Sequence, residues 1–168
     1  MRILGVDPGL RTTGYGAVEA TDGHLVLLEG GVVTTTLELP LEGRLAELYD
    51  GLWGVLVDTR PNVVVVEELY SKYGHPKTAI LMGHARAVAF LAAARFGAPV
   101  CGYTASAIKR SLTGSGRASK EQVQQMVARL LKLAEVPGPA DVADALALAV
   151  CHASWENQTP GRRGGRRN

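Results

Sequence analysis

The first 36 residues carry short apolar runs that are separated by turn signals. Residues 2–6 form an apolar run that stops at Asp7-Pro8-Gly9, and residues 13–20 and 24–36 are rich in valine, threonine and leucine. Asp22-Gly23 separates the latter two runs and is typical of a tight turn between antiparallel strands. This pattern predicts three antiparallel strands at the N-terminal end.

Helical and strand-like patterns alternate in the rest of the chain. Residues 63–66 are a continuous valine run, typical of a strand buried on both faces, and residues 99–103 predict another short strand. Apolar spacing predicts helices over about 40–59, 75–97, 104–112, 119–131 and 140–155. Three strands, a helix, a strand, a helix, a strand and further helices predict an α/β domain with a mixed sheet.

The segment 75–97 is more apolar than a helix that covers one sheet needs to be. Between Ala79 and Ala94, 14 of 16 residues are apolar or glycine, and only His84 and Arg86 are polar. One apolar stripe would suffice for one sheet. A second apolar face indicates either contact with a second copy of the chain or a central place in the core, and the pattern leaves both open.

Composition predicts the domain organisation and the cellular compartment. The 168 residues fit one domain, expected over residues 1–156. Residues 161–168 hold four of the 18 basic side chains and no acid, which predicts a disordered arginine-rich tail over 157–168. The N-terminal segment lacks the features of a signal peptide, and no apolar run reaches the ~18 residues of a membrane helix. Two isolated cysteines favour a reduced, cytoplasmic protein without a membrane segment.

Carboxylates stand where the core should begin. Asp7 ends the first strand, Glu67 and Glu68 follow the buried valine run, and Asp141 and Asp144 lie one helical turn apart. Each has an ordinary explanation as a turn residue, a strand end or a favourable charge at a helix N-terminus. If the first and fourth strands are neighbours, the acids meet at one edge. Such a cluster favours divalent cations, Mg²⁺ above all, and two ions suit phosphodiester hydrolysis.

Basic and aromatic residues extend this hypothesis to a nucleic-acid substrate. Lys109 and Lys120, with Arg117, flank a Gly-Ser-Gly loop that suits a phosphate backbone, although a solvated surface explains them too. Tyr70 follows the valine run, as does Tyr73, and either residue could stack on an unpaired base or pack under a loop. His152 lies two turns beyond Asp144, so it could face the same way and assist the acids. No dinucleotide or phosphate-loop motif occurs, so no organic cofactor is expected.

The ordered set of motifs resembles one family. The set comprises GVDPGLRTTGYG at 5–16, VVEELY at 65–70, GHARAV at 83–88, a Lys-Arg, Gly-x-Gly and Lys pattern over 109–123, and ADVADALALA at 140–149. It closely resembles the bacterial RuvC family of Holliday junction resolvases, in the ribonuclease H-like superfamily. The resemblance covers residues 1 to about 155. It implies a five-stranded mixed sheet, three strands antiparallel and then two parallel, flanked by helices.

The resemblance also implies an activity and its residues. It implies a homodimeric endonuclease of DNA recombination and repair, in which each subunit makes one of two paired, symmetric nicks in a four-way DNA junction. The implied catalytic and metal-binding acids are Asp7, Glu67, Asp141 and Asp144, which selects Glu67 over Glu68. The implied DNA-binding residues include Lys109, Lys120 and Tyr70, to which we add Arg117 from the basic loop. Mg²⁺, two ions per subunit with Mn²⁺ as a substitute, and the RuvA–RuvB complex are the implied cofactor and partner.

Three other functions fit parts of the pattern. A related nuclease that processes RNA on the same fold would share the acids. A non-catalytic junction-binding module would share the basic residues, although the complete acid set argues against it. An actin-like ATPase shares an Asp-Pro-Gly motif on its first strand, but this chain is too short for the two lobes of such proteins.

Overall fold

Five strands form one mixed sheet in the computed structural model, which describes residues 1–68 and 76–158. The strand order is β3-β2-β1-β4-β5. Strand β1 pairs antiparallel with β2, which pairs antiparallel with β3, whereas β1, β4 and β5 are parallel. The sequence prediction of three antiparallel strands followed by two parallel ones is confirmed. The strands are β1 (Arg2–Asp7), β2 (Thr12–Thr21), β3 (His24–Thr34), β4 (Val63–Glu67) and β5 (Val100–Tyr103).

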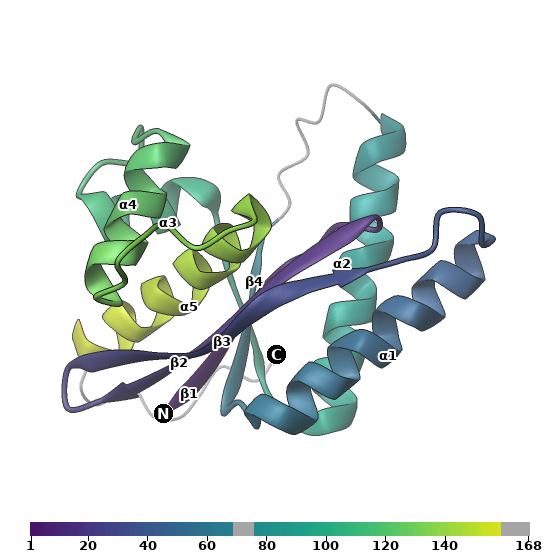
Figure 1. Ribbon diagram of the computed structural model, residues 1–168, viewed down its shortest axis with the longest axis horizontal. Helices are drawn as coiled ribbons and strands as arrows, with labels where there is room; N and C mark the ends of the chain where they lie inside the picture. Colours follow the sequence, from purple (N-terminus) through teal and green to yellow (C-terminus); the bar gives the residue numbers. More distant parts are fainter. Residues whose placement is uncertain (69–75, 159–168) are drawn as a thin grey trace, which may run out of the picture.

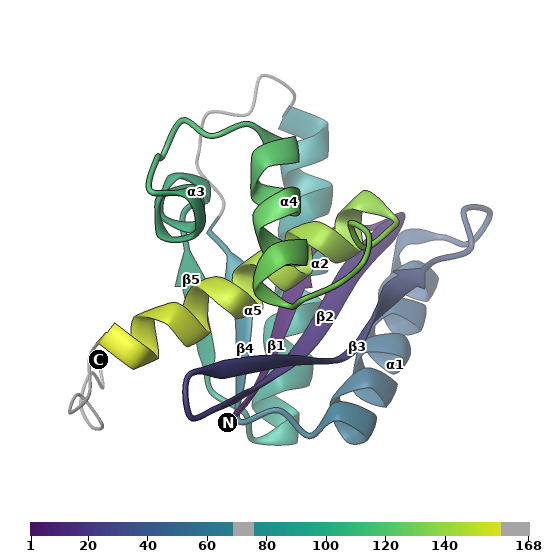
Figure 2. The same cartoon turned by 60° about the vertical axis from the view of Figure 1, so that its left-hand side comes forward.

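Helices cover both faces of this sheet (Figures 1 and 2). One face packs against α1 (Leu41–Thr59) and α2 (Pro76–Phe96), and the other against α3 (Ala105–Thr113), α4 (Lys120–Leu130) and α5 (Ala140–Gln158). The helix α5 extends past Trp155, where its apolar pattern ends. Tyr70 and Tyr73 lie outside the described residues, as does most of the arginine-rich segment.

Alternation along the strands decides which face each residue meets. Val65 packs under α3, α4 and α5, whereas Leu4 and Val66 pack against α1 and α2. Asp7 and Glu67 continue the odd-numbered series of β1 and β4, so their side chains emerge on the α5 side. The two strands are neighbours and parallel, so both acids lie at the same edge of the sheet.

Glycines allow α5 to lie close to β1 and β2. A Cβ atom on Gly5 would overlap the carbonyl oxygen of Ala145, and one on Gly14 would overlap the carbonyl group of Asp141. Gly16 likewise lies against the side chain of Leu146. This close approach brings the first turns of α5, with both of their aspartates, to the edge where β1 ends.

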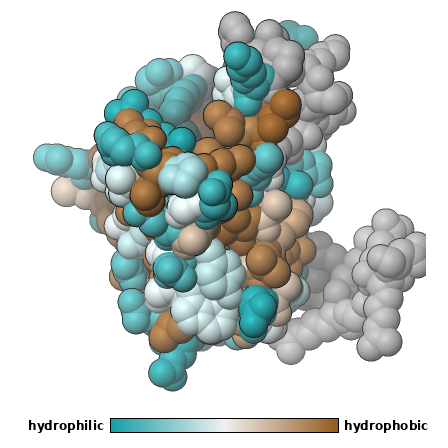
Figure 3. Space-filling view, turned by 90° about the vertical axis from the view of Figure 1, so that its right-hand side faces the viewer, coloured by the Kyte–Doolittle hydropathy of each residue, from teal (hydrophilic) through white to brown (hydrophobic). Residues whose placement is uncertain are grey.

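The helix α2 is apolar on two sides. The helix over Lys77–Phe96 is, by length and composition alone, long and apolar enough to cross a membrane, although polar residues interrupt its apolar run, as the sequence indicated. Ala85, Ala92 and Ala93 are buried between α2 and the rest of the core. Apolar side chains also gather on the outer surface of the molecule, on the side where α1 and α2 lie (Figure 3). Packing on the sheet therefore uses only one side of the helix.

Candidate active site

Acids from two strands and one helix meet basic side chains in an open pocket of about 220 Å³. It lies at the edge where β1 and β4 end, with α3, α4 and α5 around it. The apolar residues of its lining come from these three helices. The lining residues are Asp7, Glu67, Ala105, Ile108, Lys109, Lys120, Val123, Asp144, Ala147 and Leu148.

Asp7 is the most perturbed acid of the pocket. Burial is the main cause that raises its pKa to about 7, and the charges of Asp144, Glu67 and Asp141 raise it further. The ammonium group of Lys120 acts in the opposite direction. Near neutral pH, Asp7 therefore exchanges a proton readily, and a cation that enters the pocket would displace that proton.

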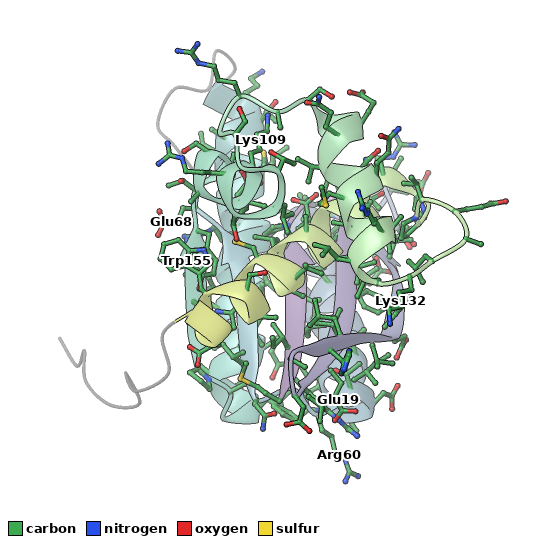
Figure 4. All side chains as sticks on the ribbon, turned by 90° about the vertical axis from the view of Figure 1, so that its left-hand side faces the viewer. Glu19, Arg60, Glu68, Lys109, Lys132 and Trp155 are labelled. Atoms are coloured by element: carbon green, nitrogen blue, oxygen red, sulfur yellow. The ribbon has the colours of Figure 1, made fainter. Side chains whose placement is uncertain are left out.

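The structure distinguishes Glu67 from its neighbour Glu68. Glu67 lines the pocket, and burial followed by the charge of Asp144 raises its pKa, against the effect of Lys109 and Lys120. Glu68 is the next residue along the chain, so its side chain points to the opposite face of the sheet. Its side chain lies beside Gly102 on β5, at the edge of the sheet (Figure 4). Of the two glutamates, Glu67 is therefore the one that lines the pocket with Asp7.

A helix N-terminus positions one of the two lysines of the pocket. The α4 helix begins after Ser119. The Ser119 Oγ accepts a hydrogen bond from the backbone N–H of Gln122 at 3.2 Å, and the Gln122 Oε1 accepts one from the backbone N–H of Ser119 at 2.9 Å. This capping box places Lys120 at the first position of α4, where its Nζ lies 2.6 Å from Asp144 Oδ2. That hydrogen bond raises the pKa of Lys120. Lys109, which also lines the pocket, comes from α3 (Figure 4).

Other sequence candidates lie farther from the pocket. Asp141 lies in the first turn of α5 beside Gly14, where its charge acts on Asp7 without lining the pocket. Arg117 is exposed on the loop before α4. His152 is buried, its Nδ1 lies 2.8 Å from the Tyr103 hydroxyl, and burial lowers its pKa. The hypothesis that His152 faces the acids is therefore not supported by its contacts.

Sequence reasoning missed one contact. Arg86 on α2 donates from Nε to the backbone carbonyl of Glu67 at 3.1 Å, from the face of the sheet opposite α5. A lone arginine in an apolar helix gave only a weak signal. Pro8 has no backbone N–H group, and this missing donor is the sequence signal that could have pointed to the Glu67 carbonyl as the partner of Arg86.

The pocket has the chemistry of a divalent-metal site. Its acids are all carboxylates, the donors that Mg²⁺ and Mn²⁺ prefer, and burial together with the charges of the other acids raises the pKa values of Asp7 and Glu67. Within residues 1–68 and 76–158, no three acids, histidines or cysteines lie close enough to hold one ion. Lys120 provides the nearest positive charge to Asp144. A metal ion at Asp144 would therefore have to displace this ammonium group.

Comparisons with known proteins agree on one family. The sequence profile of crossover junction endodeoxyribonuclease RuvC matches residues 3–152. RuvC from Desulforamulus reducens is 44% identical over 162 residues, which cover 96% of this chain and 99% of that protein. RuvC from Chloroflexus aurantiacus is 47% identical over 154 residues, covering 91% and 93%. Thermus thermophilus RuvC, solved in complex with a Holliday junction substrate, has a TM-score of 0.89, 36% identity and coverage of 94% and 96%.

Proposed function

The chain belongs to the RuvC family of crossover junction endodeoxyribonucleases, and from this premise we propose that it resolves four-way DNA junctions as a Mg²⁺-dependent homodimer. The observation that carries the proposal is the pocket, where carboxylates from two parallel strand ends and from α5 face two lysines. Carboxylates that hold metal ions, next to lysines that bind phosphate, are the groups that phosphodiester hydrolysis requires.

The acids hold the metal ions in this proposal. Asp7, Glu67, Asp141 and Asp144 bind two Mg²⁺ ions per subunit, and Mn²⁺ can replace Mg²⁺. Bound metal supplies an activated water and offsets the charge on the leaving oxygen. Partial burial of the carboxylates of Asp7 and Glu67 lowers their exposure to water, which strengthens their interaction with any cation in the pocket.

The basic side chains bind the DNA backbone. Lys109 and Lys120 line the pocket and would contact the phosphates that flank the scissile bond. Arg117 is exposed on the adjacent loop, where it would contact a phosphate farther along the strand. Tyr70 would stack on a base near the junction centre. Lys120 donates to Asp144 in this structure. When DNA and metal bind, Lys120 would turn to the phosphate and Asp144 to the metal ion.

A panel of substrates tests this function against its rivals. With Mg²⁺, we expect rapid cleavage of a mobile four-way DNA junction and at least tenfold slower cleavage of duplex DNA and structured RNA of matched length. Faster cleavage of the RNA would identify an RNA-processing nuclease instead. Tight junction binding without cleavage in either Mg²⁺ or Mn²⁺ would identify a non-catalytic module, and ATP hydrolysis would favour the actin-like alternative.

The outer face of α2 is the proposed contact between the two copies. Ile80 and Leu91 are 60% and 53% exposed and border a shallow apolar hollow of about 500 Å³. The hollow is lined by Leu45, Ile80, Gly83, His84, Ala87, Val88 and Leu91. This face combines a groove with protruding apolar side chains, so it suits the isologous contact of a symmetric dimer.

Ile80→Asp should therefore separate the dimer. A charge buried in an apolar contact is costly, so we expect a shift from dimer to monomer at micromolar concentrations, measured by size-exclusion chromatography with light scattering. Val26→Asp is the matched control, because Val26 is 57% exposed but lies on β3. A dimer that survives Ile80→Asp, or one that Val26→Asp disrupts equally, would move the contact elsewhere.

Two further assignments follow from the family. We propose that the enzyme acts with the RuvA–RuvB branch-migration complex, because resolution requires a junction that has been moved to a cleavable position. We also place the protein in the cytoplasm, where its DNA substrate lies. Cys101 and Cys151 are both free, which is consistent with a reducing compartment.

A further inference from the structure

The peptide that links Glu67 to Glu68 lies where β4 leaves the sheet. On β4, the N–H groups of Val64 and Glu68 donate to the carbonyl oxygens of Pro99 and Tyr103, both at 2.9 Å, on the β5 side. Successive residues of a strand direct their backbone groups to opposite neighbours. The carbonyl group of Glu67 is therefore directed toward β1.

Strand β1 has no donor for this carbonyl group. The pairing of β1 with β4 ends at Val6 and Val66, and the next N–H group of the parallel ladder would belong to residue 8. Residue 8 is proline, which has no N–H group. The Asp7-Pro8-Gly9 turn therefore ends the pairing of β1 with β4, while Asp7 still pairs with Gly14 on β2, and it leaves the Glu67 carbonyl without a partner on β1.

Arg86 supplies the missing donor from α2. Its Nε lies 3.1 Å from the carbonyl oxygen of Glu67. Its guanidinium carbon lies 4.3 Å from the ring centroid of Phe90, one turn farther along α2, and this cation–π contact restricts the rotamers of Arg86. The peptide between Glu67 and Glu68 is thus held at its carbonyl by α2 and at its N–H by β5.

We propose that Arg86 is a positioning residue that replaces the N–H group absent from Pro8 and so fixes the direction in which Glu67 enters the metal pocket. Holding both hydrogen-bonding groups of this peptide fixes the ψ angle of Glu67. The proposal rests on the proposed nuclease function for its effect on catalysis. The same helix carries the apolar face assigned to the second copy, so Arg86 also joins that helix to the catalytic edge of the sheet.

Single-turnover kinetics separate positioning from binding. For Arg86→Ala, we expect cleavage at saturating enzyme to fall about 10–100-fold, as for partners that orient metal ligands, and the Mg²⁺ midpoint to rise. Junction affinity, measured without cleavage in Ca²⁺, should stay within about twofold because Arg86 lies outside the pocket. Arg86→Lys keeps a donor and should recover part of the rate. Arg95→Ala, an exposed arginine on the same helix, is the control and should match the wild type.

Amide exchange tests the anchoring without substrate or metal. Loss of the carbonyl's partner lets this peptide rotate, so the Glu68 N–H should exchange at least tenfold faster in Arg86→Ala, while the Val65 N–H in the middle of β4 stays protected. Arg95→Ala should change neither. Because this readout needs no activity, it decides the role of Arg86 even if the chain proves not to cleave junctions.

Restoring the backbone donor provides a reciprocal test. Pro8→Ala returns an N–H group to the position from which β1 would pair with Glu67, so Arg86→Ala should lose less rate in the Pro8→Ala background than in the wild type. The proposal is overturned if Arg86→Ala keeps its cleavage rate and its Glu68 protection. It is equally overturned if the rate falls only together with junction affinity and thermal stability, since that would mark a purely structural role.

Discussion

Asp7→Asn should abolish junction cleavage and leave junction binding intact. Asp7 lies near enough to Asp144, Glu67 and Asp141 for their charges to act on it, and an amide cannot supply the negative charge that a divalent cation needs. A loss of about 4 kcal/mol of transition-state stabilisation corresponds to a rate at least about a thousandfold lower. Gel-shift binding and single-turnover cleavage with the same junction measure both effects.

Stability measurements exclude unfolding as the cause. The pKa of Asp7 is raised from 3.8 to about 7 in the fold, so its burial favours the protonated form and progressively destabilises the metal-free protein as the pH rises from 3.8 to about 7. Asp7→Asn removes this penalty, so the metal-free variant should melt above the wild type at pH 8 and equal it near pH 4. Asp50→Asn, on the exposed side of α1, is the matched control for charge. Full cleavage by Asp7→Asn would contradict the metal-site assignment.

Gly5→Ala should cause the largest loss of stability among conservative changes. The added Cβ would overlap the carbonyl oxygen of Ala145, so α5 would have to move away from β1. Backbone cannot yield as a side chain does, and such overpacking costs about 3 kcal/mol. For a domain of this size, that lowers the melting temperature by about 6–12 °C, measured by differential scanning calorimetry.

Gly54→Ala is the opposite control. A Cβ at Gly54 meets nothing within 4 Å, and the residue lies inside α1. Alanine is the better helix former, so this change should stabilise the fold by about 0.5–1 kcal/mol. Equal effects of the two substitutions would mean that α5 does not lie as close to the sheet as the glycines indicate.

The sheet could be predicted because each of its strands carries a local signal. The valine run of β4, the Asp-Gly turn between β2 and β3, and the Pro-Gly stop after β1 are physical consequences of burial and turn geometry. Strand ends also predicted the meeting of Asp7 with Glu67, because parallel neighbours end at one edge.

The sequence could not specify what depends on three-dimensional contacts. Spacing alone could not show which of Glu67 and Glu68 points toward the acid cluster. The register of β4 with its neighbours, together with the alternation of side chains along the strand, shows that it is Glu67. Lys120 was expected to meet DNA, but its ion pair with Asp144 depends on how α4 packs beside α5. The role of Arg86 required the position of α2 relative to Pro8. His152 pairs with Tyr103 on β5, a contact between α5 and the sheet that periodicity does not reveal.

Mapping the nicks in a mobile four-way junction tests the central claim most directly. Each strand is end-labelled in turn, and the junction is incubated with the protein and Mg²⁺. Paired nicks at symmetric positions in two strands of like polarity, absent with EDTA and absent with Asp7→Asn, are the result expected of a homodimeric resolvase whose acids hold metal. Nicks in a single strand, scattered cleavage of all four strands, or cleavage that persists without a divalent cation would contradict it.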